Sequence, residues 1–261
     1  MQIVSDDTKL EVRTGGSGDA VVLLHGFPFS SEVWKSQIET LSQTNFVVAP
    51  DLRGLGKSAV SPGPYLMESL AGDLAAVLDA LGVERASIVG HSLGGYVAMA
   101  FFRMFSERVL RLAFVCSRID ADPPAVEKAR LQLAEAAESS GTMQPILDFY
   151  GGKLFAAGTN DAVRRYAREI MEKNDPFGAA AMLRGMAARV TSEDLIEELT
   201  IPVLLVTGGH DALSPAGIWD GVIPGAQLVV CENSAHVPML EEPKRLTGYV
   251  ESFLRSRDGR N

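Results

Sequence analysis

Cysteine is scarce in this chain, and its scarcity excludes two kinds of stabilising site. Only Cys116 and Cys231 occur among 261 residues, each at the end of an apolar run. Two thiols are too few for a disulfide framework or for a zinc site built on cysteines. We therefore expect both cysteines to be buried free thiols.

Basic charge and long apolar runs are also in short supply. Lys and Arg number 24 against 33 Asp and Glu, a net charge of -9, which argues against a nucleic-acid or anionic-lipid partner. No apolar run approaches the length of a membrane span, and the opening MQIVSDDTKL lacks the basic and apolar regions of a signal peptide. We expect a cytoplasmic protein with no membrane partner, either a monomer or a homodimer.

Apolar residues, by contrast, are plentiful at 46% and regularly arranged. Six short apolar runs have the β-branched character of buried strands: AVVLLHG, FVVAPD, ASIVGHS, RLAFVCS, PVLLVTGG and AQLVVCEN. Amphipathic stretches of helical length lie between most of them, at residues 32–42, 65–81, 94–105 and 241–255. With weaker strand candidates at residues 2–5 and 9–13, the pattern predicts an α/β fold, a mostly parallel eight-stranded sheet with helices on both faces.

One interval, residues 118–190, contains no convincing strand. Its helical patterns, broken by DPP, SSG, YGG and NDPFG, predict an inserted bundle of about four short helices. We therefore divide the chain into a core, residues 1–118 and 191–261, and a helical cap, residues 119–190. Open α/β sheets bind ligands at the carboxyl ends of their strands, so a cap over that edge would cover the site.

The most informative motif is GHSLG at residues 90–94, a G-x-S-x-G pattern between a predicted strand and a predicted helix. Such a pattern is typical of the nucleophile elbow, a turn so tight that only small residues fit beside the serine. Ser92 is therefore our candidate nucleophile. A serine hydroxyl needs a neighbouring base, held in orientation by a carboxylate.

The candidate base is His236, because the loop SAHVP follows the last predicted strand and lies at the same sheet edge as Ser92. Asp211 follows the strand PVLLVTGG and is the candidate acid, which gives the chain order Ser, Asp, His. Asp120 and Asp122, after the preceding strand, remain alternatives for the acid.

An oxyanion hole needs two preorganised N–H donors. We expect one from the backbone of Leu93, the residue after the nucleophile, and one from Phe27 in the loop HGFP. The side chains of Phe27, Phe29, His91 and Val237, in or beside these segments, are candidates for the substrate pocket.

The motif GLGKS at residues 54–58 suggests a phosphate-binding loop, but Asp51 stands where that loop requires glycine. We interpret it as a turn that orders the loop beneath the site, within which Asp51 and Arg53 would pair.

Taken together, HGFP, DLRGLGKS, GHSLGG, GGHD and SAHVPMLEEP resemble the α/β-hydrolase-fold enzymes of the capped esterase and lactonase type. The resemblance covers nearly the whole chain and is loose only in the cap. It implies that Ser92, His236 and Asp211 act as nucleophile, base and acid through an acyl-enzyme intermediate. Since these groups and two N–H donors suffice for acyl transfer, neither a metal nor an organic cofactor is expected.

We predict hydrolysis of a small-molecule carboxylic ester with a small or medium acyl group, and two alternatives stay open. The second function is hydrolysis of a lactone, since residues 30–58 resemble enol-lactonases in which a cap cation meets a substrate carboxylate; Arg164, Arg165 or Arg168 pointing inward would favour an acidic substrate. The third is a hydrolase-like receptor or signalling protein, which would bind a small ligand without cycling.

Overall fold

The computed structural model describes residues 1–6 and 8–256, and an eight-stranded sheet runs through its centre. The strand order is β1-β2-β4-β3-β5-β6-β7-β8. The first two strands join antiparallel to their neighbours, and all later pairs are parallel. The strands are β1 (Gln2–Ser5), β2 (Thr8–Gly15), β3 (Ala20–Leu24), β4 (Phe46–Pro50), β5 (Ala86–His91), β6 (Val109–Val115), β7 (Val203–Gly208) and β8 (Gln227–Cys231).

The central strands β3, β5 and β7 are buried along their whole length, as their unbroken apolar sequences predict for strands covered on both faces. Their register aligns the carboxyl ends. Leu24 lies opposite Gly90, Gly90 opposite Phe114, and Phe114 opposite Leu205. The loops that follow these strands, which carry the candidate catalytic residues, therefore leave the sheet along one edge.

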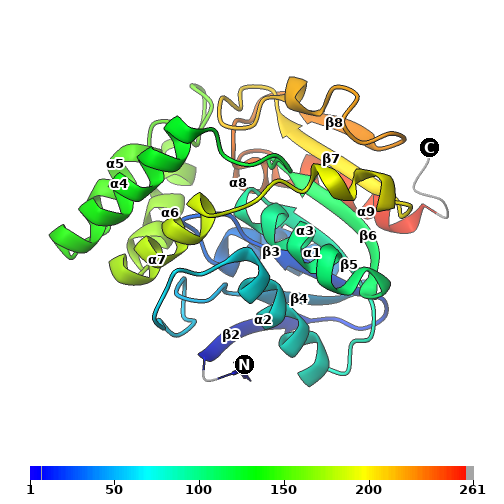
Figure 1. Cartoon of the computed structure of the whole chain (residues 1–261). Helices are drawn as coiled ribbons and strands as arrows, with labels where there is room; N and C mark the ends of the chain where they lie inside the picture. The colour runs from blue at the N-terminus through cyan, green and yellow to red at the C-terminus, as the bar shows by residue number, and fades with distance from the viewer. Residues whose placement is uncertain (7, 257–261) are drawn as a thin grey trace.

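Helices cover both faces of the sheet (Figure 1). On one face α2 packs on α3, and on the other α1 packs on α9. Their bounds are α1 (Lys35–Leu41), α2 (Met67–Ala80), α3 (Leu93–Phe105) and α9 (Pro243–Arg255), with a single turn α8 (Pro238–Glu241) before the last. The predicted fold class is confirmed.

The inserted helical cap lies between β6 and β7 and gathers on one side of the sheet, at the left of Figure 1. Its helices are α4 (Pro124–Ser140), α5 (Gln144–Tyr150), α6 (Asp161–Glu172) and α7 (Pro176–Ala187). α4 packs along α7, and Leu133, Met182 and Leu183 are buried there. The division of the chain at residues 118 and 191 stays a prediction.

Two predicted helices are interrupted in the structure. The helix predicted at residues 32–42 is preceded by a short 3-10 turn, Ser31–Trp34, in which the Glu32 N–H donates to the Ser30 hydroxyl, and α1 begins only after this turn. Residues 241–255 contain a break at Glu242, with φ -130° and ψ 58°. Proline disfavours helical geometry in the residue before it, so Pro243 ends α8 and begins α9.

The two cysteines are free and buried, as expected. No helix among the described residues is long and apolar enough to cross a membrane.

Candidate active site

Ser92 occupies a strained turn between β5 and α3, with φ 49° and ψ -112°. The turn depends on its two glycines. A Cβ on Gly90 would lie 2.4 Å from the carbonyl oxygen of Gly94, and a Cβ on Gly94 would lie 2.3 Å from that of Leu24. The Ser92 N–H donates to the carbonyl of Val115 (3.0 Å), which ties the strained residue to the end of β6.

His236 and Asp211 form a buried pair. His236 Nδ1 donates to Asp211 Oδ2 at 2.9 Å, and Asp211 Oδ1 accepts the N–H groups of Leu213 (2.8 Å) and Ser214 (3.1 Å). Burial raises the pKa of Asp211, but His236 and the two N–H donors outweigh it, and the pKa lies below its usual value. The carboxylate therefore stays ionised and orients the His236 ring through Nδ1.

His91 lies behind this pair. Its Nε2–H donates to the backbone carbonyl of His236 at 2.8 Å, and the two ring centroids are 5.1 Å apart. Burial, aided by the neighbouring His236, lowers the pKa of His91 to about 3. The ring is therefore neutral, with its proton on Nε2, and it fixes the main chain of the candidate base.

The HGFP loop is anchored by His25. Its Nδ1–H donates to the carbonyl of Gly26 (3.0 Å), and its Nε2 accepts the N–H of Leu52 (2.9 Å). The loop passes close to the nucleophile, because a Cβ on Gly26 would lie 3.1 Å from Ser92 Cβ and 2.4 Å from His91 Nδ1. This proximity suits Phe27 for the role of second oxyanion donor.

Leu93 is the first residue of α3, so its N–H has no carbonyl one turn earlier in the helix to bind. The positive end of the helix dipole adds to the attraction for negative charge at this point. Both candidate oxyanion donors thus belong to segments that flank Ser92.

Ser92 and His236 line a cavity of about 440 Å³ beneath the cap. Its apolar wall includes Phe27, whose ring meets Tyr150 of α5 edge to face at 5.6 Å, and Leu133 of α4. The volume is typical of a site for a small organic ligand.

The sequence-based pocket candidates Phe29, His91 and Val237 need correction, because all three are fully buried away from this cavity. The Phe29 N–H bonds to Gly26 and closes a turn that carries the ring to the far side, against His91. The buried residues Tyr96 and Tyr150 line the cavity.

The alternative acids have other partners. Asp120 pairs with Arg118, and Asp122 pairs with Arg130 (2.5 Å) and Arg189 (2.8 Å), whereas the His236 imidazole meets Asp211.

The expected pairing of Asp51 with Arg53 is wrong. Asp51 accepts the backbone N–H groups of Ser31 (2.7 Å) and Lys57 (2.8 Å), and Arg53 instead binds Asp73 of α2 at 2.6 Å. Asp51 thus orders the GLGKS turn by accepting main-chain N–H groups. The closeness of Asp51 to Arg53 in the sequence could not indicate these partners.

The cations that line the cavity are Arg118, Arg130 and Lys153, none of which was a sequence-based candidate. The three cap arginines that were candidates lie elsewhere: Arg164 donates to Ala156 O (2.6 Å), Arg168 pairs with Glu172, and Arg165 is exposed. A signal existed for Arg118, since it follows β6 at the catalytic edge. No local pattern marks Arg130.

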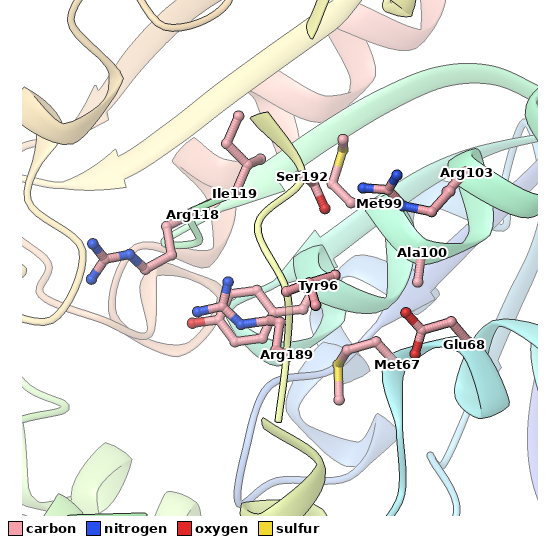
Figure 2. A pocket seen from close by; sticks show the side chains of 11 residues that line it. Met67, Glu68, Tyr96, Met99, Ala100, Arg103, Arg118, Ile119, Arg189 and Ser192 are labelled. Carbon is pink, nitrogen blue, oxygen red and sulfur yellow. The ribbon is translucent and has the colours of Figure 1, made fainter. Parts of the chain in front are cut away.

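A smaller pocket adjoins the cavity and shares Tyr96 and Arg118 with it (Figure 2). The Arg189 guanidinium lies over the Tyr96 ring, 3.9 Å from its centroid, while Arg118 points away from both. The volume of this smaller pocket, about 10 Å³, is enough for a single water molecule.

Comparison with known proteins agrees with this geometry. The chain is 31% identical to a pimeloyl-[acyl-carrier protein] methyl ester esterase of Nitrosomonas europaea, covering 94% of this chain and 99% of the relative. Among solved structures, a thermophilic esterase from Thermogutta terrifontis, malate bound, matches with a TM-score of 0.93 and 33% identity over 98% of this chain and 97% of that one. The enol-lactonase from Burkholderia xenovorans LB400 matches with a TM-score of 0.89 and 25% identity over 98% of this chain and 100% of that one.

The chain also matches a sequence model of a protein family. The model described as the alpha/beta hydrolase family covers residues 21–247, which include the elbow, the cap and the Asp211–His236 pair. The chain therefore belongs to the α/β-hydrolase family and is similar to its esterases and lactonases.

Proposed function

We propose that this protein is a serine hydrolase that cleaves a carboxylic ester of small to medium acyl chain through an acyl-enzyme intermediate. One observation carries the proposal. His236, joined to the buried Asp211 at 2.9 Å, lines the same cavity as Ser92 in the strained turn. A residue held at positive φ without being glycine is costly, and such strain persists where geometry at a site requires it.

In this mechanism Ser92 Oγ attacks the ester carbonyl carbon, and His236 Nε2 takes the hydroxyl proton. Asp211 stabilises the imidazolium, and the N–H groups of Phe27 and Leu93 bind the oxyanion. His236 returns the proton to the leaving alcohol. A water molecule, deprotonated by His236, then attacks the acyl-enzyme and releases the acid.

The substrate size follows from the cavity. About 440 Å³ beneath α4 and α5 accommodates a small or medium acyl group. We assign residues 1–118 and 191–261 to the catalytic core and residues 119–190 to the cap that bounds this cavity.

A lactonase is the second candidate, favoured by the similarity to the Burkholderia enol-lactonase and by the cations in the cavity wall. The same groups would open a cyclic ester. A lactonase prefers the lactone to its open-chain analogue, whereas an esterase shows the reverse.

A receptor would react once or not at all. The cytoplasmic location and the choice between monomer and homodimer stay predictions.

The decisive experiment measures initial rates on p-nitrophenyl esters from acetate to decanoate and on γ- and δ-lactones. In Ser92→Ala we expect kcat/KM to fall by about 10⁴-fold or more, because the nucleophile is lost. Ser36→Ala, an exposed serine, is the matched control and should keep the wild-type rate. Stoichiometric labelling by an organophosphonate in wild type but not in Ser92→Ala supports the acyl-enzyme. Unchanged turnover in Ser92→Ala would overturn the mechanism.

A further inference from the structure

The ionisable side chains that line the cavity, apart from His236 and two tyrosines, are three cations and one carboxylate. They are Arg118, Arg130, Lys153 and Asp122. This wall is electropositive in a chain whose net charge is -9. Because the chain as a whole is acidic, its composition does not explain the positive charge of this wall.

The nearby carboxylates do not neutralise it. Asp122 divides its two oxygens between Arg130 and Arg189, and Asp120 serves Arg118. The four cations Arg118, Arg130, Arg189 and Lys153 therefore carry two more charges than the two carboxylates Asp120 and Asp122. Arg118, Arg130 and Arg189 are half-buried, while Lys153 is exposed. An anion bound beside half-buried cations offsets part of their desolvation cost.

Two of the cations also have hydrogen-bonding capacity to spare. Arg130 Nη1 reaches only the Tyr150 hydroxyl, at a long 3.4 Å, and the Met186 sulfur, a weak acceptor, at 3.5 Å. Lys153 Nζ lies 3.5 Å from the centroid of the Phe149 ring and has no carboxylate partner within the described part of the chain. Both groups can accept an anion without breaking an existing ion pair.

The geometry points to a carboxylate-binding subsite formed by Arg118, Arg130 and Lys153 in the same cavity as Ser92, so that the preferred substrate is an ester or lactone bearing a carboxylate. This inference rests on the proposed function for the reacting carbonyl. A guanidinium matches a carboxylate through paired N–H donors, and an ammonium adds charge at the mouth. Binding at this second point would orient the carbonyl toward Ser92.

The test compares matched pairs of substrates by methanol or acid release. The monomethyl esters of the C4 to C8 dicarboxylic acids are set against neutral methyl esters of equal acyl length. A second arm places the carboxylate on the alcohol, as 4-acetoxybutanoate against butyl acetate, and a third uses a γ-lactone with and without a carboxymethyl group. We expect kcat/KM at least 10-fold higher for the anionic member of one arm, with an optimum chain length that measures the span from Ser92 to the cations.

The variants assign the preference to the subsite. In Lys153→Met and Arg118→Gln the anionic-to-neutral ratio of kcat/KM should fall about 10-fold, and the inhibition constant of free adipate should rise in parallel. Lys128→Met removes the same charge from an exposed position of α4 outside the cavity lining and should leave both values unchanged.

Two outcomes would overturn the subsite. One is a neutral preference in all three arms, and the other is equal behaviour of Lys153→Met and Lys128→Met. In either case Ser92-dependent turnover of neutral esters would leave the proposed function standing. Turnover that survives Ser92→Ala would instead overturn the proposed function, whatever the charge preference.

Discussion

His91 is adjacent to Ser92 in the sequence, yet its imidazole acts on a different residue. The Nε2–H holds the carbonyl of His236 while the rings of Phe29 and Trp34 pack beside it. We interpret His91 as a positioning residue that sets the main chain of His236, the proposed base.

Replacement of His91 should therefore separate positioning from packing. His91→Phe removes the donor, and we expect kcat to fall about 10-fold with little change in KM. His91→Gln keeps an N–H donor near the Nε2 position and should recover most of the rate. Steady-state kinetics checks this, and equal losses in the two variants would show that only ring packing matters.

The buried histidines also make stability depend on pH. Burial lowers the pKa of His91 to about 3 and lowers that of His25, against 6.5 for the unfolded chain. Below pH 6.5 these histidines bind protons in the unfolded state but not in the folded state. Their contribution to the free energy of unfolding is therefore fully present above pH 6.5 and is lost as the pH falls. For His91 alone the free energy of unfolding should decrease by about 2 kcal/mol between pH 7 and pH 5.

Urea unfolding at several pH values measures this slope. The slope should decrease by about one proton in His91→Gln, since glutamine does not titrate. The exposed His210 is the matched control, and His210→Gln should keep the wild-type slope. A His91→Gln slope identical to that of wild type would contradict the assignment.

Some residues of the site could be predicted from the sequence and others could not. Ser92, Asp211 and His236 could be singled out because each follows a recognisable strand, and parallel strands bring their carboxyl ends to one edge. Arg130 could not, because the direction of a side chain on α4 depends on how the cap packs. Arg53 was paired wrongly for the same reason, since its partner Asp73 is brought near only by the packing of α2.

At the scale of the element, the junction of β3, β5 and α3 tolerates no added side chain at Gly94, where a Cβ would lie 2.3 Å from the carbonyl oxygen of Leu24. We expect Gly94→Ala to destabilise the protein by about 3 kcal/mol or more, because main chain must move. Thermal unfolding and esterase activity together check the loss.

A glycine in a neighbouring helix provides the contrast. Gly72 lies inside α2 with no atom within 4 Å of an added Cβ. Gly72→Ala should stabilise the protein by about 0.5 to 1 kcal/mol through helix propensity alone. A Gly94→Ala protein as stable as Gly72→Ala would show that the elbow can relax.

Elements were predictable where one pattern dominates. The buried strands are short β-branched runs, and the absence of strands between residues 118 and 190 is confirmed by α4 to α7. The break at Glu242 was missed although Pro243 marks it, because the amphipathic pattern continues across the proline.

At the scale of the whole molecule, Asp122 connects the two ends of the cap. Its side chain is 2% exposed and binds Arg130 on α4 and Arg189 after α7. Asp122→Asn removes the charge that both guanidinium groups share, and we expect a loss of about 3 kcal/mol with faster amide exchange in residues 124–187 than in the core.

Hydrogen exchange with mass spectrometry locates the effect. Asp194→Asn breaks an exposed pair with Arg103 and should leave exchange in the cap unchanged, since such surface pairs contribute little. Uniform acceleration across cap and core in Asp122→Asn would mean that the residue supports the fold in general and not the cap.

The segments that enter and leave the cap meet where the Ser192 N–H donates to the carbonyl of Ile119 at 2.8 Å. An insert whose ends meet can be lengthened, shortened or replaced without stretching the sheet that carries Ser92, Asp211 and His236. The chemistry and the choice of substrate are therefore free to evolve separately. If the proposed function holds, a cap from another member of the family, grafted between these two residues, should change which ester is cleaved and leave the cleavage step intact.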